Sequence, residues 1–317
     1  MQTAMQRSAI LAGGLGLFLG CALMWLARPV PDGEPVVAPL DAEADVFAPP
    51  LAADAPQDAW GAAVRRGERL IQNTAAEAPA HVGNGLACRN CHLDGGRKAG
   101  AAPLWAAYPN FPAFRAKNQT INSFQKRAQD CFLYSMNGVP PALGSDELNA
   151  IEAYAAYMAQ GLRLGESLPE RGFPKIAAPP LPFDEGRGAV VYAEQCAACH
   201  GEDGAGQTLG ETVYPPLWGA RSYNWGAGMA TIDKAAAFIR ANMPQGMENS
   251  LSVQQAWDVA VFIDSQHRPQ DPRFKDSVAA TRAAHHDNGF SRYGTEVDGR
   301  KLGDPGQTPP SGFAVGN

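Results

Sequence analysis

Two short stretches of the chain, "CRNCH" and "CAACH", place a histidine directly after a pair of cysteines. The residues concerned are Cys88, Cys91, His92, Cys196, Cys199 and His200. This C-x-x-C-H spacing is that of c-type haem attachment, in which two thiols bond to the porphyrin edge and the histidine is held under the iron. One copy alone would also fit a redox dithiol or half of a zinc site, but two copies favour haem. The sequence therefore predicts two covalently bound haem c groups.

A c-type haem iron usually takes a second axial ligand from a loop far from the haem motif. In the second half of the chain, the stretch "RANMPQG" offers Met243, which lies 43 residues after His200. Met229 and Met247 are its competitors. Because Asn-Met-Pro before a closing helix resembles the methionine loop of class I cytochromes c, we expect His200 and Met243 to ligate the second iron.

The corresponding position in the first half, 39 residues after His92, is occupied by Cys131. Met136 is the competing ligand. Cys131 has no cysteine near it, so it is either a buried core cysteine or an iron ligand. Because the second half has its methionine at the equivalent place, we expect His92 and Cys131 to ligate the first iron.

The residues around Cys131 favour its thiolate form. We expect a helix over about 120–136, in which Arg127, Cys131 and Ser135 share one face because they are spaced four residues apart. A cation four residues from a thiol favours the thiolate, which is the form that binds metal. A thiolate stabilises ferric iron, whereas methionine opposite histidine raises the potential. Electrons are therefore expected to run from the first haem to the second.

Three cations lie in the stretch "FRAKNQTINSFQKRAQDC": Arg115, Lys117 and Arg127. Each one alone is explained as well by a surface position or by a haem propionate. As a cluster just before Cys131, they favour an anionic substrate. An electron carrier has little use for a thiolate-ligated haem, so this pattern favours a catalytic centre.

Both halves of the chain contain the same order of elements. An amphipathic helix, "AWGAAVRRGERLIQNT" or "DEGRGAVVYAEQ", precedes the haem motif; a loop with Pro-Leu-Trp and a closing helix follow it. The first closing helix is predicted between Ser145 and Gly161, and the second starts at a capping box of Ser252 and Gln255. Each half therefore resembles a class I cytochrome c. The predicted fold is mainly α and loop-rich, with two such domains in tandem.

The N-terminal segment indicates export. Residues 8–27 carry no charge, and the length of this run favours an uncleaved membrane anchor over a cleaved signal peptide, with a lipoprotein site at Cys21 as a third alternative. All three predict a periplasmic protein, and the anchor predicts attachment to the inner membrane. The net charge of −6 argues against nucleic-acid binding.

The predicted boundaries follow from composition and from the haem motifs. They are 1–29 for the signal peptide or anchor helix, 30–58 for a flexible linker, 59–165 for the first cytochrome c domain, 166–182 for an interdomain linker, 183–270 for the second domain and 271–317 for an extended C-terminal tail. The tail is too polar for a core of its own, so we expect an ordered strap. Its histidines, His285 and His286, are read as structural or surface residues.

These features together resemble a known family. The paired C-x-x-C-H motifs, the lone cysteine before "SMNG", the cation-rich stretch and the tail "HRPQDPRFKDSVAATRAAHHDNGFSRYGTEVDGRKLG" are similar to those of the thiosulfate dehydrogenases, periplasmic dihaem cytochromes c that join two thiosulfates into tetrathionate. The resemblance covers about residues 60–305. It implies that the Cys131 haem is the active-site haem and that the Met243 haem is the electron exit. It also implies that Arg115, Arg127 and Ser135 lie near the substrate.

Three positions depart from the pattern of this family. Lys117 stands where arginine is usual, which keeps the charge but loses the bidentate geometry of the guanidinium. Tyr134 stands where arginine is common, which removes a charge. Asn242 stands where some members have a lysine that competes with the neighbouring methionine, so this exchange favours simple His/Met ligation of the second haem.

The resemblance leads to a mechanistic hypothesis. Two thiosulfate dianions repel each other, and Arg115, Lys117 and Arg127 are placed to offset that repulsion. Cys131 leaves the iron or reacts at sulfur, carrying a sulfane-sulfur adduct while the S–S bond forms. Two electrons then pass through both haems to an external acceptor, such as a small cytochrome c. The direction stays open, because the same site suits tetrathionate reduction.

Two other classes of function remain alternatives. A non-enzymatic dihaem carrier predicts methionine at both irons and leaves Cys131 unexplained. A cytochrome subunit of a sulfur-oxidising or respiratory complex allows a cysteine ligand, but it needs partner proteins for turnover. Thiosulfate-dependent reduction of the purified chain separates the enzyme from both.

Overall fold

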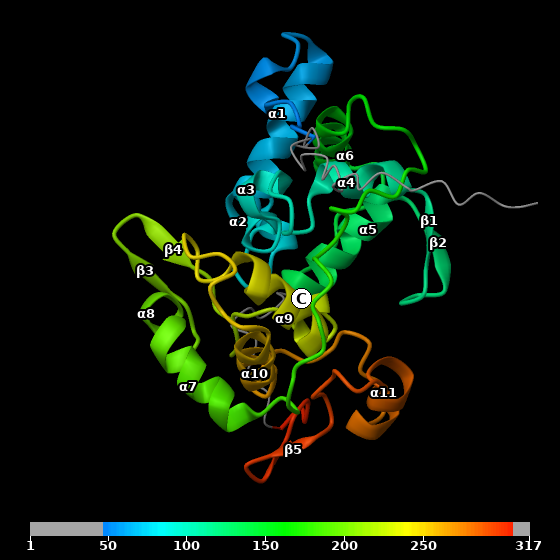
Figure 1. Cartoon of the computed structure of the whole chain (residues 1–317). Helices are drawn as coiled ribbons and strands as arrows, with labels where there is room; N and C mark the ends of the chain where they lie inside the picture. Colours follow the sequence, from blue (N-terminus) through cyan, green and yellow to red (C-terminus); the bar gives the residue numbers. More distant parts are fainter. Residues whose placement is uncertain (1–46, 307–317) are drawn as a thin grey trace, which may run out of the picture. The chain divides into compact units, whose positions relative to one another are not determined.

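The computed structural model describes residues 47–306 as a mainly helical, loop-rich chain with three short antiparallel hairpins among them (Figure 1). The prediction of a mainly α, loop-rich fold is thereby confirmed. The predicted signal or anchor segment, 1–29, and the first part of the predicted linker lie outside the described residues. Within 47–306, no helix is both long enough and apolar enough to cross a membrane.

The first group of helices packs around the first haem motif. α1 (Ala59–Gln72) lies against α6 (Asp146–Met158), and the side chain of Ser145 caps α6 as predicted. The two helices cross at Gly67, where a Cβ atom would clash with the backbone of Ala150. A side chain at this position would therefore push the helices apart.

The second group has the same kind of crossing. α7 (Glu185–Gln195) lies against α10 (Val253–Asp264), and α9 (Ile232–Asn242) packs on α10 as well. The close contact is again at a glycine, because a Cβ atom on Gly188 would clash with the backbone of Asp258. In both groups, the helix before a haem motif meets the closing helix at a residue without a side chain.

The remaining short elements connect these helices. Three hairpins pair β1 (Ala113–Arg115) with β2 (Thr120–Asn122), β3 (Gln207–Leu209) with β4 (Thr212–Tyr214), and β5 (Glu296–Val297) with β6 (Arg300–Lys301). The short helices are η1 (Ala52–Asp54), α2 (Thr74–Glu77), η2 (Pro79–His81), η3 (Cys88–Asn90), α3 (Leu93–Gly96), α4 (Leu104–Ala107), η4 (Tyr108–Asn110), α8 (Ala197–His200) and η6 (Gly228–Ala230).

The helix that carries Cys131 is shorter than predicted and changes type. The chain at 120–122 is strand β2, so the expected start of the helix near Thr120 is wrong. α5 (Phe124–Asp130) begins after Ser123, whose side chain caps it. The chain then continues as a π-helix, η5 (Cys131–Ser135). Such turns are rare and are often found at functional sites.

The C-terminal tail contributes α11 (Val278–His285) and the β5–β6 hairpin. It shares a buried cluster with both halves of the chain, formed by Tyr134, Tyr223, Trp225, Ala227, Ala230, Val278, Tyr293 and Leu302. The tail therefore packs against Tyr134, only three residues after Cys131.

Candidate active site

One cavity contains the first haem motif and the lone cysteine. Its lining includes Cys88, Cys91, His92, Cys131, Ser135 and Met136, together with Tyr223 and Met229 from the second half. Nδ1 of His92 donates a hydrogen bond to the carbonyl oxygen of Ala102 at 2.7 Å. This hydrogen bond fixes the ring so that Nε2 remains for a metal.

The cavity sets Cys131 apart from the two cysteines of the motif. Burial raises the pKa of both Cys88 and Cys91 to about 12. Burial also acts to raise the pKa of Cys131, but the charge of Arg127 and the interaction with His92 outweigh it, and the pKa falls to about 6. Nη1 of Arg127 donates a hydrogen bond to Sγ of Cys131 at 3.0 Å. Cys131 is therefore the thiol of this cavity that favours the thiolate at neutral pH.

The π-helix keeps Ser135 beside Cys131. The backbone N–H of Met136 donates to the carbonyl oxygen of Cys131 at 3.0 Å, which is the i to i+5 bond of a π turn. Ser135 lines the same cavities as Cys131. The predicted proximity of Arg127, Cys131 and Ser135 is therefore confirmed, although an α turn and a π turn produce it in place of one regular helix.

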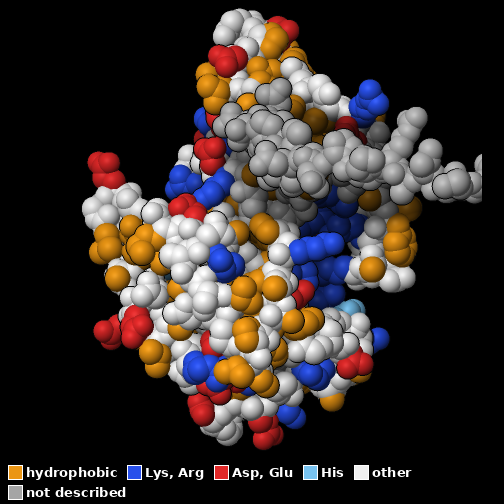
Figure 2. All heavy atoms as spheres, viewed as in Figure 1, with side chains coloured by type: hydrophobic (Ala, Val, Ile, Leu, Met, Phe, Trp, Pro, Cys, Tyr) orange, Lys and Arg blue, Asp and Glu red, His pale blue; other side chains and the backbone are white. Residues whose placement is uncertain are grey.

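A second, larger cavity of about 1200 Å³ opens from the same site. Cys91, His92, Cys131 and Ser135 lie in its wall. Its cations are Arg115, Lys117, Arg127, Lys175, Lys234 and Arg273, and its carboxylates are Asp130 and Asp233. Figure 2 shows Lys and Arg side chains gathered in a hollow of this face, with a histidine at its edge. The excess of positive charge suits an anionic ligand.

The three cations predicted from sequence all lie in this cavity, each in a different environment. Arg115, on β1, has its pKa lowered by burial and by the charges of Arg127 and Arg171. Burial lowers the pKa of Lys117 to about 8, with Arg273 and Arg127 acting in the same direction. Positive neighbours thus add to burial in lowering the pKa of Arg115 and of Lys117, whereas the charge of Cys131 raises the pKa of Arg127. The positive charge at Arg115 and Lys117 is therefore incompletely neutralised by the protein.

Lys117 and Tyr134 are in contact, which the sequence did not indicate. Nζ of Lys117 lies 3.7 Å from the centroid of the Tyr134 ring and donates a hydrogen bond to the carbonyl oxygen of Gly226 at 2.5 Å. A Cβ atom on Gly226 would clash with the same ring. Two of the three positions that depart from the family pattern are therefore in direct contact.

The tail supplies residues that the sequence analysis missed. Arg273, His285 and His286 line the large cavity, although the two histidines were read as structural or surface residues. His286 is buried and contacts Asp271, so it is structural as well as cavity-lining. No local motif marks these residues, because they reach the site only through the packing of the tail against Tyr134.

A loop of the second half fixes the backbone of η5. The amide group of Asn224 donates to the carbonyl oxygen of Leu133 at 2.9 Å and to Oδ1 of Asn137 at 3.0 Å. The backbone N–H of Asn224 donates to the carbonyl oxygen of Tyr134 at 3.1 Å. These bonds satisfy carbonyl groups that a π turn exposes at its end. The position of Cys131 thus depends on both halves of the chain.

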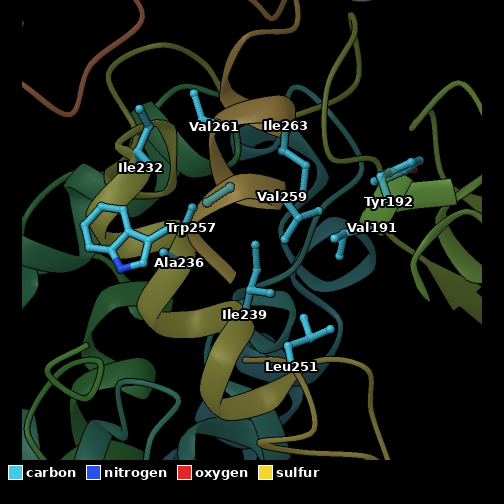
Figure 3. Close-up of a cluster of buried hydrophobic side chains, with 12 residues drawn as sticks. Val191, Tyr192, Ile232, Ala236, Ile239, Leu251, Trp257, Val259, Val261 and Ile263 are labelled. Atoms are coloured by element: carbon cyan, nitrogen blue, oxygen red, sulfur yellow. The ribbon is translucent and has the colours of Figure 1, made fainter. Parts of the chain in front are cut away.

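The second haem motif has a parallel arrangement. Nδ1 of His200 donates to the carbonyl oxygen of Pro215 at 2.9 Å, as His92 does to Ala102. Met243 packs with Cys196 against the buried cluster of α7, α9 and α10 shown in Figure 3. Of its competitors, Met247 is 57% exposed, and Met229 lines the cavity of the first motif. Met229 also packs against this cluster, so its place in the cavity of the first motif, and not its packing, distinguishes it from Met243.

Asn242 joins the second site to the first. Its amide group donates to the carbonyl oxygens of Gly100 and Phe238, at 2.9 and 3.0 Å. Gly100 follows the first haem motif in the chain. The side chain next to Met243 is therefore buried between the two halves.

Comparisons with known proteins identify the family. Residues 184–263 match the family model described as cytochrome c oxidase, cbb3-type, subunit III, which supports a haem c fold in this part. The chain is 49% identical over 300 residues to a thiosulfate dehydrogenase of Thiomonas intermedia (strain K12), covering 93% of this chain and 95% of the relative. It is 49% identical over 260 residues to that of Stutzerimonas stutzeri (strain A1501), covering 81% and 85%.

A solved structure gives the same result. The thiosulfate dehydrogenase TsdBA from Marichromatium purpuratum, in its "as isolated" form, matches with a TM-score of 0.79 and 45% identity. The match covers 82% of this chain and 58% of that one. Given relatives of this identity and coverage, the chain belongs to the thiosulfate dehydrogenase family and is an oxidoreductase.

Proposed function

We propose that this protein oxidises two thiosulfate ions to tetrathionate at a haem whose iron is ligated by His92 and Cys131. The observation that carries the proposal is the environment of Cys131: a thiolate-favouring thiol that shares a cavity with a C-x-x-C-H motif and accepts a hydrogen bond from Arg127. Tetrathionate as product and the reverse reaction are both part of the proposal.

The residues present fit two haem c groups. Each motif has two cysteines outside any disulfide and a histidine whose Nδ1 is bonded to a backbone carbonyl. Cys131 would be the second protein ligand of the iron at the first site, and Met243 at the second. When bound, the two haems would supply one-electron redox chemistry, taking up both electrons and delivering them to an external acceptor.

The side chains of the cavity perform the rest of the chemistry. Joining two thiosulfates forms one S–S bond and releases two electrons, and no proton is gained or lost. The main obstacle is repulsion between two dianions, which Arg115, Lys117 and Arg127 offset by their positive charge. Arg127 also holds Cys131 in place, and Ser135 offers a hydroxyl group beside it.

Cys131 takes part as a nucleophile in this proposal. A thiolate attacks a sulfur atom more readily than a thiol does, and the surroundings of Cys131 favour the thiolate. It carries the whole first thiosulfate: a bond forms between Sγ and the sulfane sulfur as two electrons leave, one to each haem that the chain would hold. The sulfane sulfur of the second thiosulfate then attacks that of the first, and the Cys131 thiolate is the leaving group, so the product is tetrathionate. Both ions lie in the cavity that opens at Cys131.

The arrangement of the chain is also part of the proposal. We assign 59–165 and 183–270 to two cytochrome c domains, with the linker 166–182 between them and the tail 271–317 after them, of which the described part, up to residue 306, packs on both. The linker contributes Phe173 to the wall of the large cavity. The uncharged run at 8–27 supports a periplasmic location, with a small redox protein as the electron acceptor.

The proposal is tested by steady-state oxidation of thiosulfate with an artificial one-electron acceptor. The purified holoprotein should reduce the acceptor and form one tetrathionate for every two electrons. Cys131→Gly should lose this activity while it keeps both haems. Full turnover by the variant would contradict the role of Cys131, and a wild type that transfers electrons but does not oxidise thiosulfate would be an electron carrier.

A further inference from the structure

Two cations from distant parts of the chain meet at the ring of Tyr134. Nζ of Lys117 lies 3.7 Å from the ring centroid, and Cζ of Arg273 lies 5.1 Å from it. Lys117 follows strand β1, whereas Arg273 belongs to the tail. Both line the large cavity. Tyr134 is uncharged, but the tail brings a guanidinium group to its ring.

The tail holds Arg273 rigidly. Its Nε and Nη2 donate to the two carboxylate oxygens of Asp271, at 3.0 and 2.6 Å, and the side chain of Asp271 is fully buried. His286 contacts the same carboxylate at 2.9 Å and stacks on Tyr293 with 4.3 Å between the ring centroids. The guanidinium group is therefore positioned before any ligand arrives, which lowers the entropic cost of binding.

The positive charge at this end of the cavity exceeds what the protein neutralises. The carboxylate of Asp271 is shared by Arg273 and His286. Among residues 47–306, no carboxylate lies within ion-pair distance of Lys117, whose contacts are the carbonyl of Gly226 and the ring of Tyr134. Nη1 of Arg273 also has no hydrogen-bond partner within this part of the chain.

We propose that Lys117 and Arg273 form a second anion subsite, which binds the sulfonate group of the second thiosulfate and one end of tetrathionate. The first subsite is formed by Arg115 and Arg127 beside Cys131. A tetrathionate ion carries a sulfonate at each end, so it occupies both subsites at once. This inference rests on the proposed function, because that function supplies two sulfonates to one cavity.

A second subsite should affect the binding of long anions and short anions differently. Tetrathionate reaches both pairs of cations at once, whereas sulfate is too short to span them and keeps the first pair as a site when the second is weakened. Loss of charge at Arg273 should therefore weaken tetrathionate binding and leave sulfate binding nearly unchanged. A general, long-range effect of charge would weaken both equally.

The test is calorimetric titration of the oxidised holoprotein with tetrathionate and with sulfate. Oxidised protein has no electrons to give, so binding is measured without turnover. Arg273→Gln keeps a donor for Asp271 but removes the charge, and it should raise the Kd for tetrathionate by roughly tenfold, as expected for a lost charge-assisted hydrogen bond. Arg273→Lys should recover part of the affinity. The matched control is Lys234→Gln, which removes a cavity cation that pairs with Asp233.

Three results would overturn the subsite: no measurable binding of tetrathionate to the wild type, equal losses for Arg273→Gln and Lys234→Gln, or a change in haem reduction potential with unchanged Kd values. The last result would make Arg273 a partner of a haem propionate. Binding and turnover are measured separately, so the two proposals can fail independently. A wild type that does not oxidise thiosulfate would refute the proposed function. A loss of affinity for tetrathionate alone in Arg273→Gln would still support the subsite.

Discussion

Nη1 of Arg127 donates a hydrogen bond to Sγ of Cys131 across the point where α5 becomes the π-helix η5. The distance is 3.0 Å, and the charge of Cys131 in turn raises the pKa of Arg127. The two residues therefore stabilise each other's charged forms. This pair links the helix geometry to the redox chemistry proposed for the site.

Removal of the Arg127 charge should impair catalysis more than it impairs folding. Hydrogen bonds to charged groups contribute about 1.5–3 kcal/mol, so Arg127→Gln should lower kcat/KM for thiosulfate by roughly tenfold to a hundredfold. Arg171→Gln is a suitable control, since Arg171 lies near Arg115 but does not bond Cys131. Equal activity of Arg127→Gln and the wild type would show that the hydrogen bond has no role in turnover.

The pH dependence of substrate binding should depend on Lys117. Burial lowers its pKa to about 8, so Lys117 is charged below that pH and loses its charge as the pH rises through it. The groups that face it are Arg127, Asp130, Tyr134, Asp271, Arg273 and His285. KM for thiosulfate should therefore rise above about pH 8. The change in kcat should be smaller, because the bound dianion favours the charged form of Lys117 in the substrate complex.

Lys117→Arg is the control for this pH profile. Arginine keeps its charge over the whole range, so the rise in KM near pH 8 should disappear. A variant profile that matches the wild type would mean that another group causes the pH dependence.

Asn224 should stabilise the π-helix from the other half of the chain. Asn224→Ala removes the donor to the carbonyl of Leu133 and leaves that carbonyl without this partner. The expected loss is about 1–3 kcal/mol in the free energy of unfolding, together with a weaker thiolate-to-iron band in the absorption spectrum. Asn149→Ala, which removes exposed side-chain hydrogen bonds on helix α6, should change neither quantity. A spectrum unaltered by Asn224→Ala would show that η5 holds Cys131 without this loop.

The two helix crossings should be intolerant of any side chain. Gly67→Ala and Gly188→Ala place a methyl group against the backbone of the facing helix, so each should cost about 1–3 kcal/mol in thermal or denaturant unfolding. Gly289 has open space around it, and Gly289→Ala serves as the matched control. Unchanged stability in both crossing variants would mean that the helices separate freely.

Much of the regular structure follows from local sequence. Ser145 caps α6, and Ser252 with Gln255 forms the predicted capping box of α10. These signals are reliable because a cap satisfies backbone groups within one turn and does not depend on the rest of the fold. The predicted start of α5 is too early, because the segment before Ser123 pairs as a hairpin strand that no short-range signal marks.

The chemistry of the site was predictable only in part. The spacing of the haem motifs singled out Cys131, and the nearby cations followed from their place in the same stretch. The π turn was not predictable, because its carbonyl groups are satisfied by Asn224 from the other half. Arg273 was missed for a similar reason: it reaches Tyr134 through the packing of the tail, which is a tertiary contact.

The ligation of the first iron by Cys131 is the central claim, and the absorption spectrum of the ferric holoprotein tests it most directly. The wild type should show a thiolate-to-iron charge-transfer band. The band should be lost in Cys131→Gly and kept in Met243→Gly. A wild type without the band, or a Cys131→Gly spectrum that retains it, would contradict the account.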